Sequence, residues 1–238
     1  MPSDLIFDFF GTLVEYTAGS FHTAPYERTH SFLLQHDFQL DYATFVRLYS
    51  DVAADLETQA QHTAREYHMD DVARAFFGAA FDRAVAPAII QGFVSCFIAE
   101  WSRGIHFIEG IQPFLSELAS EYRLGILSNT HYPALIHNNL AQMKVAQCFT
   151  SIVTSVEFGW RKPHPSIFKH ALAELATSAS DALYIGDTYL DDYVGAKAAG
   201  IRAVMIDPHD QFPNANDRIA SLFDLKHFLL RETRKKGQ

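Results

Sequence analysis

The sequence predicts an α/β protein in which a doubly wound parallel sheet carries an inserted all-helical domain. Three observations predict this fold class. A short apolar run leads into Asp8, as expected of a strand that is buried on both faces. Residues 16–105 show only helical spacing of apolar side chains. After Gly110 helical and strand-like segments alternate, which is the pattern of a parallel sheet with right-handed crossovers.

The length of 238 residues suits a core domain plus a smaller insertion. We assign residues 1–15 and 106–238 to the core domain and residues 16–105 to the insertion, with hinges at 16–19 and 103–109. Pro87 suits the first turn of a helix, where its missing N–H has no cost. In the insertion we expect helices over 21–36, 41–68, 70–84 and 87–103, with most aromatic side chains in their core.

The elements of the core domain follow from the same patterns. Apolar runs predict strands after the first one, and amphipathic segments between them predict helices. Gly200 is expected to end one of these helices as its C-terminal cap. The expected strands are 124–127, 151–154, 182–185 and 203–206, and the expected helices are 111–121, 133–142, 165–176, 191–199 and 218–230.

Charge and composition narrow the possible partners. The net charge of −9 gives no bulk attraction to nucleic acid or to anionic lipid, and no apolar run approaches the ~20 residues of a membrane span. Cys96 and Cys148 form no metal-like pair, and no basic-then-apolar leader opens the chain. We therefore expect a cytoplasmic monomer or homodimer that binds a small anionic molecule, with no nucleic-acid or membrane partner.

Polar groups end three of the predicted strands: Asp8, then Ser128-Asn129, then Asp187. Parallel strands place their carboxyl ends at one edge of the sheet, so these groups can converge there. Lys162 precedes a helix of the same layer and can reach that edge. Two carboxylates suit a hard divalent ion such as Mg²⁺, whereas the lysine and the Ser128 hydroxyl suit an anion. One carboxylate would be free to attack and form a covalent intermediate.

Four motifs stand in order along the chain. They are Asp8-Phe9-Phe10-Gly11-Thr12-Leu13, Leu127-Ser128-Asn129, Arg161-Lys162-Pro163-His164-Pro165, and Gly186-Asp187 through Asp192 followed by Gly195-Ala196. With this ordered set, which is far more specific than any one motif, the chain resembles the haloacid dehalogenase-like (HAD) hydrolase superfamily, and the resemblance covers nearly all of the chain. The resemblance implies a Rossmann-like core, and the insertion looks like the helical class I cap of that superfamily.

The resemblance also implies a role for each matching residue. Asp8 would be the nucleophile, Ser128 would hydrogen-bond the transferred group, and Lys162 would neutralise both. Mg²⁺ would be held by Asp8, Asp187 and the backbone carbonyl of Phe10. Three further residues match less specific positions: Asp192 would support the lysine or the metal, Thr12 would support the first motif, and Asn129 would contribute its backbone beside the substrate.

Phe10 departs from the phosphatase pattern. Phosphatases of the family carry a second Asp there, which protonates the leaving alcohol, and such help is typically worth ~10²–10⁴ in rate. Water or another side chain, with His131 and Tyr16 as candidates, would have to replace it. The haloacid dehalogenases resemble this chain in having an aromatic residue at that position, and halide leaves without a proton. They work without a metal, however, and their fourth motif differs from Gly186-Asp187.

Three functions therefore stay open. We favour Mg²⁺-dependent phosphoryl transfer from a small phosphomonoester, because Asp187 and Asp192 would repel an anionic substrate unless a cation is bound. Hydrolytic dehalogenation of a 2-haloacid by the same Asp8 is the first alternative, in which Arg28 or Arg47 could bind the carboxylate. A HAD-fold protein that binds a phosphorylated ligand or a protein without turnover is the second.

Overall fold

The computed structural model describes residues 2–16 and 26–236, with side chains up to 231. The chain divides into two compact units, which are described separately here. The core unit comprises Met1–Glu15 and Phe107–Gln238, and the insertion unit comprises Tyr16–His106. Residues 17–19 of the predicted hinge 16–19 and residues 21–25 of the first predicted helix lie outside the described residues.

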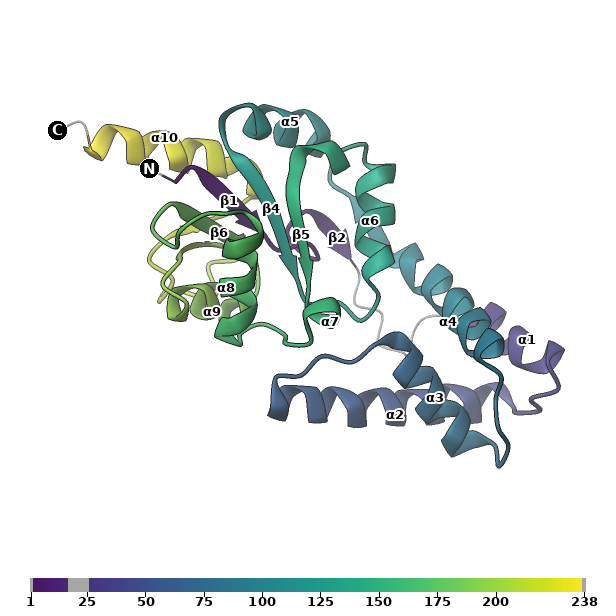
Figure 1. Cartoon of the computed structure of the whole chain (residues 1–238). Helices are drawn as coiled ribbons and strands as arrows, with labels where there is room; N and C mark the ends of the chain where they lie inside the picture. Colours follow the sequence, from purple (N-terminus) through teal and green to yellow (C-terminus); the bar gives the residue numbers. More distant parts are fainter. Residues whose placement is uncertain (1, 17–25, 237–238) are drawn as a thin grey trace. The chain divides into compact units, whose positions relative to one another are not determined.

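The core unit is built on a six-stranded sheet, in which every neighbouring pair is parallel. The strand order is β5-β4-β1-β6-β7-β8, and Figure 1 shows β5, β4, β1 and β6 with core helices beside them. This confirms the predicted doubly wound sheet. The strands are β1 (Asp4–Phe7), β4 (Arg123–Ser128), β5 (Phe149–Thr154), β6 (Ala182–Gly186), β7 (Arg202–Ile206) and β8 (Arg218–Ile219).

One prediction in the core is wrong at the C-terminal end. The segment 218–230 was expected to be a single helix, but Arg218–Ile219 pairs with β7 as strand β8. Two backbone hydrogen bonds hold it there, from Met205 N–H to the Asp217 carbonyl and from Asp207 N–H to the Ile219 carbonyl. A two-residue strand has no periodicity of its own, so only its pairing with β7 defines it. The helix α10 begins later and spans Leu225–Lys236.

The predicted helix 191–199 is also different in detail. It starts as a π-helical turn, η3 (Tyr189–Val194), and continues as α9 (Gly195–Ala198). The N–H groups of Asp192 and Tyr193 both bond to the Thr188 carbonyl, at 2.9 and 3.3 Å, which widens this turn. The other helices of the core unit are α5 (Ile111–Glu121), α6 (Pro133–Gln142), α7 (Ser155–Phe158) and α8 (Pro165–Glu174).

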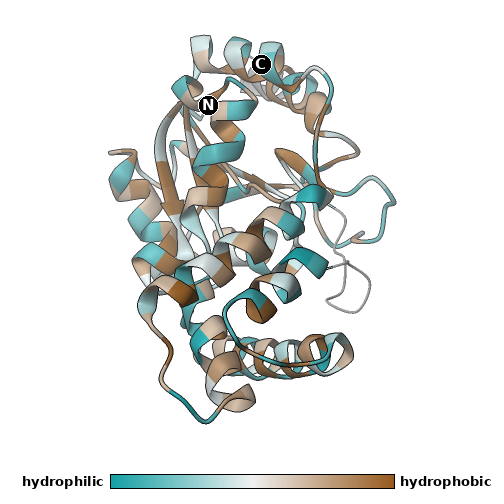
Figure 2. Cartoon of the chain, turned by 90° about the vertical axis from the view of Figure 1, so that its right-hand side faces the viewer, coloured by the Kyte–Doolittle hydropathy of each residue, from teal (hydrophilic) through white to brown (hydrophobic). Residues whose placement is uncertain are grey.

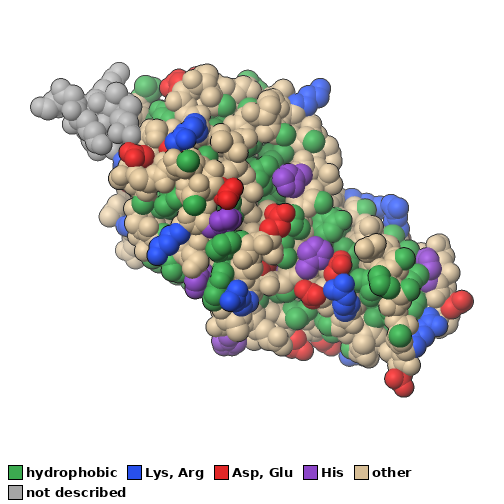
Figure 3. Space-filling model, in the orientation of Figure 1, with side chains coloured by type: hydrophobic (Ala, Val, Ile, Leu, Met, Phe, Trp, Pro, Cys, Tyr) green, Lys and Arg blue, Asp and Glu red, His purple; other side chains and the backbone are tan. Residues whose placement is uncertain are grey.

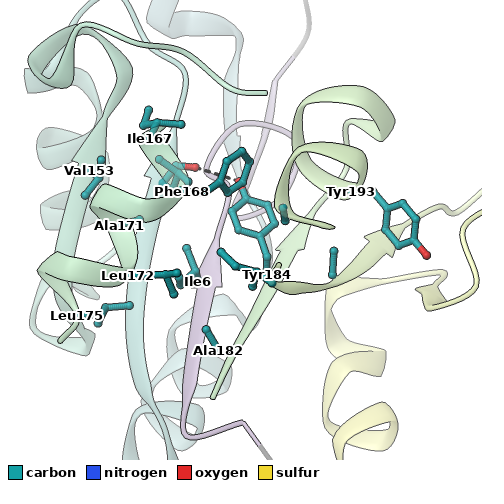
Figure 4. Packing of buried hydrophobic residues seen from close by; sticks show 14 of the residues in the cluster. Ile6, Val153, Ile167, Phe168, Ala171, Leu172, Leu175, Ala182, Tyr184 and Tyr193 are labelled. Atoms are coloured by element: carbon teal, nitrogen blue, oxygen red, sulfur yellow. Dashed lines mark hydrogen bonds between the residues drawn. The ribbon is translucent and has the colours of Figure 1, made fainter. Parts of the chain in front are cut away.

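The sheet is buried because its side chains alternate between two covered faces. On the face that α8 and α9 cover, apolar side chains from the strands pack against Phe168 and its neighbours (Figure 4). Figure 2 shows the strands as largely hydrophobic, whereas the helices carry both hydrophobic and hydrophilic residues. The strand residues on this face are Ile6, Leu127, Val153, Ala182, Tyr184, Ala203 and Met205.

The insertion unit contains four α-helices in its described part: α1 (Glu27–Gln35), α2 (Tyr42–Thr63), α3 (Met69–Ala80) and α4 (Pro87–Trp101). Aromatic rings form much of its core, as predicted. The Phe76 and Phe93 rings stack at 5.3 Å, and the Tyr49 ring lies 4.7 Å from that of Phe97. These core residues are Phe45, Tyr49, Phe76, Phe77, Phe93 and Phe97, each at most 2% exposed.

Glu100 joins two of these helices. The buried carboxylate of Glu100 in α4 accepts hydrogen bonds from the backbone N–H groups of Arg28 and Thr29, both at 2.8 Å. It also accepts the Thr29 hydroxyl at 2.6 Å. The free N–H groups at a helix N-terminus favour a negative charge. Glu100 therefore acts as a cap for α1, although it lies 71 residues away from Thr29 in sequence.

The chain passes between the two units at two places. One is in β2 (Val14–Tyr16) and the other in β3 (Ile105–Phe107), and these strands pair with each other in a two-stranded sheet. Neither strand was predicted. In the described part of the chain no helix has the length and apolar character that crossing a membrane requires. Acidic and basic side chains are interspersed on the face seen in Figure 3.

Candidate active site

The register of the sheet brings the predicted residues to one edge. Phe7 lies opposite Ile126 of β4 and Ile185 of β6. Asp8, which follows β1 directly, also donates its N–H to the Ile185 carbonyl at 2.9 Å. Ser128 ends β4 and Asp187 follows β6. Buried apolar runs fix the strands, and the polar residue after each run therefore lies at the carboxyl edge of the sheet.

Lys162 lies in the loop before α8, and its side chain is only 3% exposed. The Lys162 Nζ atom lies 2.7 Å from Asp8 Oδ1 and 2.5 Å from Asp192 Oδ1. Asp192 is buried as well, at 1% exposed. A single ammonium group thus bridges a carboxylate from the first motif and one from the fourth.

Three carboxylates gather at this point. One oxygen each from Asp8, Asp187 and Asp192 lie within 4.8 Å of one another. Two glycines give them room. A Cβ atom on Gly11 would lie 2.2 Å from Asp187 Oδ2, and one on Gly186 would lie 2.4 Å from Asp192 Cγ. Gly11 also has a φ of +81°, which side chains disfavour.

The three carboxylates have different partners. Asp192 uses both oxygens: Oδ1 accepts from Lys162, and Oδ2 accepts from the Thr188 N–H at 2.9 Å. Asp187 Oδ1 accepts the Thr12 hydroxyl at 3.1 Å. Asp8 Oδ1 accepts from Lys162, whereas its second oxygen accepts no hydrogen bond from the described residues. Asp192 is thus held by its neighbours, and Asp8 keeps an oxygen that can react or bind a cation.

Burial and charge shift the pKa values of this cluster. Burial raises the pKa of Asp8 to about 8, with Lys162 opposing the shift and Asp192 and Asp187 adding to it. The pKa of Asp187 is also raised, first by burial and then by Asp192. Burial alone would lower the pKa of Lys162, but the charges of Asp192 and Asp8 outweigh it and raise that pKa. The lysine is therefore charged, whereas burial and the neighbouring carboxylates disfavour the ionised forms of Asp8 and Asp187.

Asn129 has a role that its position did not indicate. Its side-chain Oδ1 accepts the Lys162 backbone N–H at 2.8 Å, and its Nδ2 donates to the Lys162 carbonyl at 3.1 Å. Nδ2 also lies 3.4 Å from Asp191 Oδ2. The expected contribution of the Asn129 backbone beside the substrate stays a prediction. The side chain joins the end of β4 to the loop that carries Lys162.

The remaining predicted residues are placed as follows. Ser128 is fully buried at the end of β4. Thr12 is also buried, and its hydroxyl donates to Asp187. Phe10 is half-buried, and its ring meets the Phe9 ring edge-on at 5.0 Å. Tyr16 belongs to the insertion unit, where its ring lies 6.2 Å from that of Trp101.

Sequence reasoning missed Tyr184. This residue lies within β6 and is fully buried, yet its hydroxyl contacts both Lys162 Nζ at 3.0 Å and Asp192 Oδ1 at 2.8 Å. In the sequence it stands out as a tyrosine within an otherwise apolar strand, two residues before Gly186. A buried phenol needs a hydrogen-bond partner, and this need could have pointed to the site.

Comparison with known proteins defines the class. Residues 5–206 match the family model described as haloacid dehalogenase-like hydrolase. The chain belongs to this family, and the resemblance of its motifs is confirmed. The fold agrees: the structure of a 2-haloacid dehalogenase from Pseudomonas syringae pv. Tomato DC3000 superposes with a TM-score of 0.72. That match covers 97% of this chain and 99% of the other at 21% identity, so it supports the fold alone.

Two curated relatives are more similar in sequence but over shorter stretches. A glyceraldehyde 3-phosphate phosphatase from Pyrococcus abyssi is 35% identical over 83 residues, which cover 35% of this chain and 34% of the relative. A phosphoserine phosphatase from Thermus thermophilus is 29% identical over 154 residues, which cover 63% of this chain and 61% of the relative. The chain thus matches less than two thirds of the length of either relative.

Proposed function

We propose that this protein is a Mg²⁺-dependent phosphatase that hydrolyses a small phosphomonoester through a covalent intermediate on Asp8. The charge of the site carries the proposal. One oxygen from each of three carboxylates lies within 4.8 Å of the other two, and the Lys162 ammonium group bridges two of these carboxylates. An anionic substrate would be repelled from such a site unless a divalent cation offset the excess negative charge.

The residues present fit Mg²⁺. This ion prefers oxygen ligands and is bound through one or two carboxylates together with substrate phosphate. Asp8 and Asp187 would hold it, with the Phe10 backbone carbonyl that the family pattern implies, while Asp192 has both oxygens engaged by Lys162 and Thr188. Bound Mg²⁺ would screen the carboxylates and neutralise charge on the phosphoryl group.

In the first step the second oxygen of Asp8 attacks phosphorus. An acyl-phosphate bond forms on Asp8, and the bond from phosphorus to the ester oxygen breaks. The Ser128 hydroxyl would hydrogen-bond the phosphoryl oxygens, and Lys162, whose Nζ lies 2.7 Å from Asp8 Oδ1, would neutralise charge on the phosphoryl group. In the second step water attacks phosphorus, which releases inorganic phosphate and restores the Asp8 carboxylate.

Phe10 defines which substrates suit this reaction. A phenylalanine cannot protonate the ester oxygen as that oxygen leaves, so the leaving group must accommodate the negative charge or take a proton from water. Turnover should therefore depend steeply on the pKa of the leaving alcohol, with aryl phosphates faster than alkyl phosphates. The two curated relatives named above, both phosphatases by name, support phosphomonoesters as the substrate class.

Phe10 also favours a second candidate, hydrolysis of a 2-haloacid. Here Asp8 would attack the carbon that carries the halogen, halide would leave as an anion, and water would hydrolyse the resulting ester on Asp8. No proton is needed by the departing halide, so an aromatic residue at position 10 would be no disadvantage. We rank this candidate second, because the carboxylate cluster suits a metal ion and the family's dehalogenases work without a metal.

The test is a paired assay on the purified protein. An aryl phosphate is offered with Mg²⁺ and with a chelator in excess, and 2-chloropropionate is offered with halide detection. We expect phosphate release that the chelator abolishes and Mg²⁺ restores. Chelator-resistant halide release would establish the second candidate instead. If neither substrate turns over, and Mg²⁺ together with inorganic phosphate only raises the melting temperature, the protein is a binding protein of the same fold.

Asp8→Asn tests the nucleophile and should abolish either reaction. The matched control is Asp207→Asn, because Asp207 is another buried carboxylate just beyond a strand. Its oxygens accept the backbone N–H groups of Gln211 and Phe212, both at 2.9 Å, and it lies outside the carboxylate cluster. Asp207→Asn should keep the reaction. Activity retained in Asp8→Asn would remove the assignment of the nucleophile.

A further inference from the structure

Tyr184 carries the one polar side chain of strand β6, which is otherwise apolar. It lies in the middle of β6, on the sheet face covered by α8 and α9, and none of its surface is exposed. Figure 4 shows its ring beside Phe168, with ring centroids 5.4 Å apart. The loop that carries Lys162 leads into α8, and the turn that carries Asp192 leads into α9. Both therefore lie on the face to which Tyr184 points.

The Tyr184 hydroxyl is surrounded by three polar groups. It accepts from Lys162 Nζ at 3.0 Å, and it lies 2.8 Å from Asp192 Oδ1 and 3.2 Å from the Leu127 carbonyl. The dashed line in Figure 4 marks the contact with this carbonyl. One hydroxyl hydrogen can serve either acceptor, and the carboxylate is both nearer and charged. Tyr184 thus connects the lysine, the supporting carboxylate and the residue before Ser128.

The ammonium group of Lys162 has three N–H donors. In this structure it also has three acceptors, Asp8 Oδ1 at 2.7 Å, Asp192 Oδ1 at 2.5 Å and Tyr184 Oη at 3.0 Å. Each donor therefore has a defined direction. Without the hydroxyl, one N–H of a buried cation would lack its acceptor, and the ammonium could turn toward Asp192 and away from Asp8.

We propose that Tyr184 is a positioning residue of this site: its hydroxyl fixes the Lys162 ammonium in the orientation that faces Asp8 and the group transferred to it. The inference rests on the phosphatase function proposed above. It assigns the hydroxyl alone, because the ring of a phenylalanine at this position would still pack on Phe168 and would still lie beneath the ammonium, whose nitrogen is 5.6 Å from the ring centroid.

The experiment is a double-mutant cycle with Tyr184→Phe and Lys162→Met, assayed with an aryl phosphate and Mg²⁺. We expect Tyr184→Phe to lower kcat about 10–100-fold, the usual effect of losing a hydrogen bond to a charged group. In the Lys162→Met background the same substitution should change kcat by less than about threefold. Where turnover is too slow to measure, the cycle is repeated on the Kd of inorganic phosphate with Mg²⁺.

Phe168→Leu is the control, because it disturbs the packing of the Tyr184 ring and leaves the hydroxyl in place. It should lower the melting temperature while keeping kcat within about threefold. Equal effects of Tyr184→Phe in both lysine backgrounds would mean a structural role and overturn the inference. So would a kcat of Tyr184→Phe within threefold of wild type. A wild-type protein that neither hydrolyses the aryl phosphate nor binds phosphate overturns the proposed function itself, and this inference with it.

Discussion

The side-chain amide of Asn129 forms hydrogen bonds with both backbone polar groups of Lys162, at 2.8 Å to its N–H and 3.1 Å to its carbonyl. An amide has one acceptor and one donor side, so this pairing fixes the orientation of the loop as well as its distance. The lysine is therefore held at two points. Asn129 holds its backbone, and the Asp8, Asp192 and Tyr184 side chains hold its ammonium group.

Asn129→Ala should displace the lysine loop. We expect kcat/KM for an aryl phosphate to fall about 10–100-fold, since two hydrogen bonds of about 1 kcal/mol each are lost near the reacting groups. Steady-state kinetics of the variant measure this. The control is Asn139→Ala, because Asn139 is also buried and bonds to a backbone carbonyl, that of Leu135, but within α6. Full activity in Asn129→Ala would contradict the positioning role of the amide.

Gly186→Ala should damage the site through Asp192. An added Cβ would lie 2.4 Å from Asp192 Cγ, so this carboxylate must move and release its contacts with Lys162 and Thr188. We expect at least about a 100-fold loss of kcat, within the range for misplaced charged groups. Gly78→Ala in helix α3 is the control, because no neighbouring atom lies within 4 Å of the Cβ that it adds. It should raise stability by about 0.5–1 kcal/mol and leave kcat unchanged.

Phe10→Asp tests the missing proton donor, and Phe10→Asn is its matched control, with the same shape but no acid. If the phosphatase function holds, the ratio of kcat for Phe10→Asp over Phe10→Asn should exceed about 10 with an alkyl phosphate and stay near 1 with an aryl phosphate. Initial rates across a series of leaving groups measure both. A ratio near 1 for alkyl substrates too would mean that residue 10 shapes the pocket and does not control proton transfer.

Asp4 should make stability depend on pH. Its Oδ2 accepts the Ser3 hydroxyl at 2.6 Å, the Thr177 hydroxyl at 2.7 Å and Arg123 at 3.0 Å. Burial alone would raise the pKa of Asp4, but these three partners outweigh it and hold the pKa below its ordinary value of 3.8. A carboxyl group whose pKa is lower in the folded protein than in the unfolded chain stabilises the fold at pH values above its unfolded-state pKa. This stabilisation is lost as the pH falls through the folded-state pKa.

We therefore expect Asp4→Asn to lower the free energy of unfolding by about 1–3 kcal/mol at pH 7. The difference from wild type should shrink below about pH 4, where wild-type Asp4 takes up its proton. Urea unfolding of both proteins at a series of pH values measures this difference in the free energy of unfolding. Asp217→Asn is the control: its pair with Arg202 at 2.8 Å is partly exposed, and its loss should cost under about 1 kcal/mol. A difference for Asp4→Asn that persists unchanged at low pH would exclude this linkage.

The features that depend on a single segment could be predicted from the sequence. The run before Asp8 and the run before Gly186-Asp187 are strands, because buried parallel strands are continuously apolar. The polar residues after them lie at one edge, because the strands are parallel. Helices with strong spacing, such as 111–121 and 133–142, have the predicted bounds.

The features that depend on distant contacts could not be predicted in this way. Strand β8 is defined by its pairing with β7. The π-helical turn at Tyr189–Val194 is defined by hydrogen bonds to the Thr188 carbonyl. The roles of Tyr184 and Asn129 also depend on where Lys162 lies, 22 and 33 residues away in sequence. A single sequence gives the residue types that such a site needs but not the directions of their hydrogen bonds.

The pairing of β2 with β3 has a consequence for how this chain can change. It places the start and the end of the insertion side by side, at Val14–Tyr16 and Ile105–Phe107. A loop whose ends are held together tolerates added length at little further entropic cost, about 0.6 kcal/mol for each doubling. Shorter, longer or unrelated insertions could therefore be grafted at this junction. Such chimaeras should keep the sheet and its reacting groups unaltered.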